Sequence, residues 1–245
     1  MKDIARIFVA SYRDARRAMS EAGSAIFVAA IMTLVGSMLD SILEPMIGTR
    51  VGRVILGWLV QTGVSWATAP AIVALYRYFI SGEHPARVNP NDRSANANAY
   101  FYVSVWFNVV ATIPLLADAI FGPPTQVGEH LVSSGTTLGA YVLFWYLVTR
   151  LATYLPGIAL GRSVDTMTTA FGETRKRFWF IAFTFMLTLL PAIAVTALVA
   201  YSVGSLPWWI AKPIIWLPSV AVLVLGIAVT SRLYRRLVLG ETGPA

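Results

Sequence analysis

Six long stretches of apolar residues, separated by polar loops, follow one another along most of this chain. They cover residues 24–43, 54–80, 100–121, 135–161, 178–203 and 208–230. Each stretch is close to or longer than the roughly 20 residues that an α-helix needs to cross a hydrocarbon core of about 30 Å. Strands of a membrane barrel would instead alternate in polarity over about ten residues. The pattern therefore predicts an all-α, polytopic membrane bundle of six transmembrane helices.

Composition agrees with this prediction. Only 13% of the 245 residues are charged and 57% are hydrophobic, whereas about 25% of a soluble domain is charged. Six spans with short loops use nearly the whole length, so we expect a single transmembrane domain over residues 1–245. Its parts are a cytoplasmic amphipathic helix (1–22), the bundle (24–232) and a cytoplasmic tail (233–245).

The basic residues are distributed unevenly between the two sides of the predicted bundle. With both termini on one side, that side carries 15 Lys and Arg residues and the other side carries 3, while Arg150 lies within a span. Because flanking cations resist translocation, this bias predicts a multi-pass protein of a bacterial inner membrane with both ends in the cytoplasm.

The net charge of +7 then faces the anionic cytoplasmic leaflet, which attracts basic side chains. We expect membrane lipids as partners, and no nucleic acid. The candidates for contact with lipid headgroups are Arg16, Arg17, Arg175, Lys176, Arg177, Arg235 and Arg236.

Two short amphipathic helices are predicted on the cytoplasmic side. The first covers residues 3–20, with Ile4, Phe8, Tyr12, Ala15 and Met19 at three- and four-residue spacing. Such a helix, basic on its other face, is expected to lie along the membrane surface. The second follows the fourth span, with Ser163 as its cap and Val164, Met167, Ala170 and Phe171 on one face.

An internal repeat is visible in the span ends. The second span ends in LYR followed by GE, and the sixth span ends in the same residues at the same offset. We interpret the chain as three two-helix hairpins repeated about an axis normal to the membrane, an arrangement known among transporters. VALYRYFISGE, SRLYRRLVLGE and LPGIALGRSVDTMTTAFGETRKRFW resemble uncharacterised six-span inner-membrane proteins of proteobacteria. That resemblance implies a fold and a location but no activity.

Residues for familiar catalysis are missing. The chain has no Cys, and its two histidines, His84 and His130, fall in loops on opposite sides of the predicted bundle. The HExxH, GxSxG and P-loop patterns are also absent from the sequence. We therefore expect no catalytic residues, no cofactor and no metal, and interpret the protein as not an enzyme.

Polar residues inside the spans are the candidates for a functional site: Arg150, Asp118, Asn108, Asp40 and Gln61. Arg150 precedes Arg162 by twelve residues, about 18 Å along a helix, so we expect it near the middle of the membrane. A charge there needs a partner, and Asp118, assisted by Asn108, is the predicted one. A structural tie between helices and a substrate, ion or proton site both remain open.

The sequence favours a protein that acts by association, as an accessory or scaffold subunit or a lipid-facing organiser of a larger membrane assembly. Its partner would be another integral membrane protein or a second copy of the chain. The first alternative is a small transporter or channel for an anionic or amphipathic solute that uses Arg150. The second alternative is an intramembrane enzyme acting on lipid.

Overall fold

The computed structural model describes residues 2–84, 94–121, 139, 142–143, 145–162 and 167–240. In this part of the chain the regular structure is helical and no β-strand occurs, so the all-α prediction is confirmed. The elements are α1 (Lys2–Glu21), α2 (Gly23–Leu43), the short 3-10 helix η1 (Glu44–Met46), α3 (Arg50–Ser81), α4 (Ala95–Phe121), α6 (Tyr154–Ala159), α7 (Met167–Arg175), α8 (Phe178–Ser202) and α9 (Trp208–Leu237).

Four helices in the described residues are long and apolar enough to cross a membrane. They are Gly23–Met46, Arg50–Ser81, Phe178–Ser202 and Trp208–Leu237. They match the first, second, fifth and sixth predicted spans. Helix α4 covers the third predicted span but is not one of the four. The structure therefore indicates a membrane protein with four candidate spans, and the count of six is not shown.

The fourth predicted span is not one continuous helix where the structure describes it. Residues 145–150 are helical, residues 151–153 form a turn, and α6 follows. Pro156 lies in the first turn of α6. The backbone N–H groups of a first turn have no partner within the helix, so proline costs no helix hydrogen bond there. The helix thus restarts at Tyr154, two residues before the proline, which corrects the prediction of an unbroken helix over 135–161.

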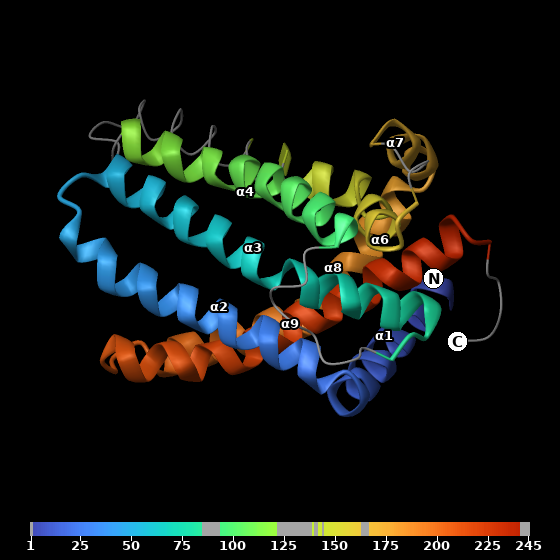
Figure 1. The fold of residues 1–245 in the computed structure, drawn as a ribbon, viewed down its shortest axis with the longest axis horizontal. Helices are drawn as coiled ribbons and strands as arrows, with labels where there is room; N and C mark the ends of the chain where they lie inside the picture. Colours follow the sequence, from blue (N-terminus) through green and yellow to red (C-terminus); the bar gives the residue numbers. More distant parts are fainter. Residues whose placement is uncertain are drawn as a thin grey trace.

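The long helices lie side by side, with their ends at two opposite ends of the molecule (Figure 1). Helix α3 lies between α2 and α4, and α9 packs on both α2 and α3. Helices α1, α6 and α7 and the last turns of α9 gather at one end, which we call the terminal end. The connection through η1 and the turn between α8 and α9 lie at the other, the distal end.

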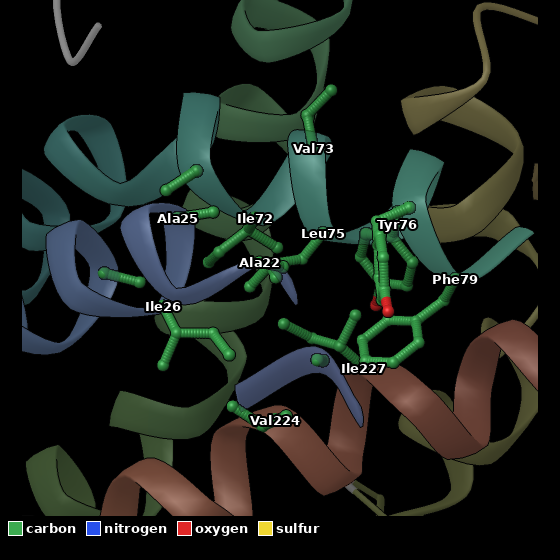
Figure 2. Close-up of a cluster of buried hydrophobic side chains, with 14 of the residues drawn as sticks. Ala22, Ala25, Ile26, Ile72, Val73, Leu75, Tyr76, Phe79, Val224 and Ile227 are labelled. Atoms are coloured by element: carbon green, nitrogen blue, oxygen red, sulfur yellow. The ribbon is translucent and has the colours of Figure 1, made fainter. Parts of the chain in front are cut away.

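A packed apolar core fills the terminal half of the bundle. It joins Ala22, Ala25 and Ile26 at the start of α2 to one face of α3 and to Val224 and Ile227 of α9 (Figure 2). Leu75 is fully buried there, and Tyr76 is 3% exposed. The core closes the space between α2, α3 and α9 at this end.

Helix α1 confirms the predicted N-terminal helix, but it turns a different face to the protein. The buried residues of its inner face are Ile7, Ala10, Ser11, Ala15 and Ala18, while Met19 is 48% exposed. This face packs on α8 and α9. Small side chains allow two helices to approach closely, and the alanines of this face lie beside one larger apolar residue, Ile7, which packs in a core cluster with residues of α8 and α9.

Ion pairs connect the start of the chain to the end of the last helix. Arg232 binds Asp14 through two hydrogen bonds, Nε–Oδ2 at 2.5 Å and Nη2–Oδ1 at 2.8 Å. Arg236 binds Asp3 at 2.8 Å. Helix α1 and the end of α9 therefore lie at the same end of the molecule.

Three glycines adopt a left-handed backbone conformation in the described part of the chain. Gly82, Gly161 and Gly240 have φ of 72°, 73° and 69°, a region that favours glycine, and they are equally spaced in the sequence. They stand at or just beyond the ends of α3, α6 and α9. This periodicity agrees with the predicted hairpin repeat, which otherwise remains a prediction.

Candidate functional site

Two adjoining hollows open between the long helices in the distal half of the molecule. The first, which we call the outer cleft, has a volume of about 640 Å³ and is lined by α2, η1, α3 and α4. The second, the inner pocket, has a volume of about 290 Å³ and is lined by α2, α3, α4, α6 and α9. Gln61 and Asn108 line both hollows, so the two adjoin at these amides.

The outer cleft carries charges of both signs: Asp40, Glu44, Arg50 and Arg53. Arg53 Nη1 lies 3.8 Å from Glu44 Oε1, an exposed and weak pair. The carboxylate of Asp40 lies beside Gly57, where a Cβ atom would stand 3.6 Å from Oδ1.

Trp58 also lines the outer cleft, and its indole nitrogen is buried without a hydrogen-bond partner in the described structure. A buried N–H group normally finds a partner. The indole N–H of Trp58 is therefore a donor in the cleft that could bond to a water molecule or a solute.

The neck between the two hollows is held by a side-chain hydrogen bond. Asn108 Nδ2 of α4 donates to Ser65 Oγ of α3 at 2.9 Å. Gln61 lies one turn before Ser65 on α3 and contributes a second amide to the same place. These two amides have both donors and acceptors, and they stand where the cleft and the pocket meet.

The inner pocket contains neutral polar groups on an otherwise apolar wall. Hydroxyls from four helices line it: Thr33, Ser65, Thr68, Ser104 and Ser219. Trp216 closes one side and donates its indole N–H to the carbonyl of Ala30 at 2.8 Å. Toward the terminal end, Ile72 and Tyr100 line the pocket and also belong to the core of Figure 2. The pocket therefore ends on packed side chains.

Three of the five predicted polar candidates come together here. Asp40 lines the outer cleft, and Gln61 and Asn108 form the neck. The side chain of Asp118 lies outside the described residues, as does His130. The sequence did not single out Thr33, Ser104, Ser219 or Trp216. Serine and threonine are common in membrane helices, and only the spatial arrangement shows that they share a pocket.

Arg150 lies elsewhere, away from both hollows. Its guanidinium carbon stands 4.9 Å from the ring centre of Phe171 and 5.8 Å from that of Tyr146. Its carbonyl oxygen accepts a hydrogen bond from Thr174 of α7 at 3.0 Å. Its Nε is buried without a hydrogen-bond partner among the described residues. The guanidinium thus lies near two aromatic rings, which attract cations, and against α7. Its pairing with Asp118 stays a prediction, because that side chain lies outside the described residues.

The basic residues predicted to meet lipid headgroups lie at the terminal end, in two different situations. Arg16 and the cluster Arg175, Lys176 and Arg177 are exposed. Others are engaged within the protein: Arg236 binds Asp3 and lies 5.5 Å from the ring of Phe180. The exposed group is the one whose charge is available to an anionic surface.

Glu21 connects α1 to the end of α3. Its carboxylate accepts hydrogen bonds from Arg17 Nε at 2.7 Å and from the hydroxyl of Tyr78 at 2.8 Å. These hydrogen bonds, that of Arg17 foremost, lower the pKa of Glu21 below its ordinary value. The terminal end is therefore stabilised by charge-assisted contacts as well as by the apolar core.

Among the described residues, no group of three or more His, Cys, Asp or Glu side chains could hold a metal ion. The site is thus built from hydroxyls, amides and balanced charges. No protein-family model, no curated protein and no solved structure matches the chain.

Proposed function

We propose that this protein is a small multi-pass membrane transporter or channel, with a polar solute passing along the outer cleft, the neck and the inner pocket. The observation that carries the proposal is the joined pair of hollows with polar linings, set between helices of membrane-spanning length. Polar groups are expensive in the interior of a bilayer, and where they gather they commonly mark the path of a solute. A packed apolar interior would have supported the association hypothesis instead.

The proposed orientation places the terminal end in the cytoplasm of a bacterial inner membrane. The positive-inside bias of the loops supports it, and so do the ion pairs that bring α1 and the end of α9 to one end. The outer cleft, with Arg50 and Arg53, then opens toward the opposite face. We retain six spans in three hairpins as part of the proposal, supported by the equally spaced left-handed glycines.

In this arrangement the structure has an outward-facing form. A solute entering the cleft meets the neck at Gln61 and Asn108, then the inner pocket, and then the core around Tyr76 and Leu75. Passage into the cytoplasm requires that core to separate. Alternating access in transporters commonly moves one group of helices against another around a central site, and the pair α8 and α9 is suited to such motion because these helices pack closely on each other.

Proteoliposomes containing the purified full-length protein test the proposal directly. Solute-driven swelling faster than that of empty liposomes is expected, and Asn108→Leu should slow it because a branched apolar side chain replaces the amide at the neck. Thr196→Val is the matched control, since Thr196 lies on α8 and lines neither hollow. The proposal fails if the purified protein moves no solute, or if Asn108→Leu and Thr196→Val behave alike.

The association hypothesis remains a prediction, and it expects different experimental results. It expects a stoichiometric membrane partner to purify with the protein in mild detergent, and it expects the purified chain alone to be inactive in liposomes. In the transport hypothesis the chain alone is sufficient.

A further inference from the structure

Four Ser and Thr hydroxyls of the inner pocket donate their protons to backbone carbonyls of their own helices. Thr33 donates to the carbonyl of Ala29 at 2.8 Å, and Thr68 donates to that of Val64 at 2.8 Å. Ser104 and Ser219 do the same within α4 and α9, at 2.7 and 2.9 Å. A hydroxyl has one donor and two acceptor lone pairs. Once its proton bonds to the helix backbone, it presents only acceptors to the pocket.

Other polar groups of the pocket wall also have their donors engaged. The indole N–H of Trp216 is used on the carbonyl of Ala30, so it offers no donor. Ser65 accepts the proton of Asn108 and keeps its own hydroxyl proton. Free donors therefore stand at the neck, on Gln61, Asn108 and Ser65. Beyond the neck the four bonded Ser and Thr hydroxyls offer only acceptors, and Tyr100, which also lines the pocket, carries one further hydroxyl.

Among the residues that the structure describes, no charged side chain lines the inner pocket. A charge that enters a low-dielectric space without a partner loses far more hydration energy than neutral hydroxyls return. In the outer cleft the described side chains include two acidic and two basic residues, so these charges give the entrance no net charge of their own. The inner pocket therefore discriminates against ions.

We infer that the inner pocket takes a small uncharged solute of the polyol class, whose several hydroxyls donate to Thr33, Thr68, Ser104 and Ser219 and accept from the amides at the neck. This inference rests on the proposed function. The volume of about 290 Å³ lies at the lower limit of ordinary ligand pockets, which suits a compact molecule.

The test measures osmotic swelling of proteoliposomes with three probes: erythritol, glycine betaine and choline chloride. Erythritol donates four hydroxyl protons, betaine is a zwitterion without an N–H or O–H donor, and choline is a cation. Erythritol is expected to enter faster than into empty liposomes, and the other two at the rate of empty liposomes. If betaine or choline enters and erythritol does not, the inference is overturned while the proposed function survives. If none of the three enters faster, the proposed function fails and the inference fails with it.

Two variants test whether the hydroxyls of the inner pocket select the solute. Thr33→Val and Ser104→Ala each remove one acceptor, and each should slow erythritol entry roughly fivefold, because one hydrogen bond contributes about 1 kcal/mol. Thr196→Val removes the same kind of hydroxyl, bonded to the carbonyl of Ala192 at 2.9 Å on α8, and should change nothing. Equal effects of all three variants overturn the inference.

A second measurement covers the case in which these variants fold poorly. In the otherwise Cys-free chain, a Ser104→Cys variant is treated with a small thiol reagent in the presence of each probe. Erythritol should protect the thiol and betaine should not. Protection by betaine alone, or by neither probe, overturns the inference.

Discussion

The ion pair between Asp14 and Arg232 gives the sharpest test of how the terminal end is held together. Asp14 lies on α1 and Arg232 near the end of α9, and the two form a bidentate pair at 2.5 and 2.8 Å. The perturbation is Asp14→Asn, which keeps the shape of the side chain and removes its charge. It leaves the Arg232 guanidinium without its carboxylate.

The exposure of the pair sets the expected magnitude. The side chains of Arg232 and Asp14 are 20% and 21% exposed. Exposed pairs contribute at most about 1 kcal/mol, whereas loss of one partner of a buried pair costs about 3–5 kcal/mol. This pair lies between those limits, so Asp14→Asn should lower the free energy of unfolding by about 2 kcal/mol. Asp3→Asn, at the more exposed pair with Arg236, is the control and should cost less than about 1 kcal/mol.

The assay is reversible unfolding in mixed micelles, followed by circular dichroism, for the wild type, Asp14→Asn, Arg232→Gln and the double variant. Because both single substitutions break the same contact, the double variant should lose little more than either one alone. Strictly additive losses, or a loss from Asp14→Asn no larger than that from Asp3→Asn, would show that the pair does not join α1 to α9.

Three further outcomes follow from the packing and the charges. Gly36→Ala should destabilise the protein by about 1–3 kcal/mol, because its Cβ would stand 2.1 Å from a methyl carbon of Val64 on α3. Adding Val64→Ala should restore the stability measured by thermal unfolding, and no recovery of stability contradicts the close crossing of α2 and α3. Glu21 has a lowered pKa, so it stabilises the fold above its ordinary value of 4.5, and this contribution is lost as the pH falls through its folded pKa. Glu21→Gln should therefore flatten the loss of thermal stability in acid, and an unchanged acid profile contradicts the hydrogen bonds of Glu21 with Arg17 and Tyr78. Arg150→Ala should lower the melting temperature, through lost packing and ring contacts, without slowing solute entry per folded molecule; a selective loss of transport would place Arg150 on the path.

Some features of the fold could be predicted from the sequence because local physics decides them. Long apolar stretches required helices, and the basic periodic segment at the start required α1. The break after Arg150 could not be predicted, because Leu151 and Ala152 are ordinary helix residues. Pro70 and Pro191 lie within continuous helices, whereas Pro156 lies in the first turn of a new one. Tertiary packing decides between these outcomes, and residue type alone does not.

The candidate site was predictable in part for a similar reason. Gln61, Asn108 and Asp40 stand out in the sequence because amides and carboxylates are rare in apolar stretches. Their convergence depends on the placement of α3 between α2 and α4, which no periodicity specifies. The expected pairing of Arg150 with Asp118, assisted by Asn108, stays a prediction, because the side chain of Asp118 lies outside the described residues. The structure places Arg150 against α7, where Phe171 and Thr174 contact it.

The central claim is that a polar path leads from the distal end into the inner pocket, and cysteine accessibility in intact membranes tests it most directly. Because the chain has no Cys, single variants can be made without background: Ser104→Cys in the inner pocket and Ile193→Cys on the outer face of α8, where Ile193 is 42% exposed. A small, membrane-impermeant thiol reagent added from the side of the distal end should modify Ser104→Cys. It should leave Ile193→Cys unmodified, because the proposed membrane arrangement turns this exposed position to lipid. Failure to modify Ser104→Cys, or equal modification of both, would contradict the path.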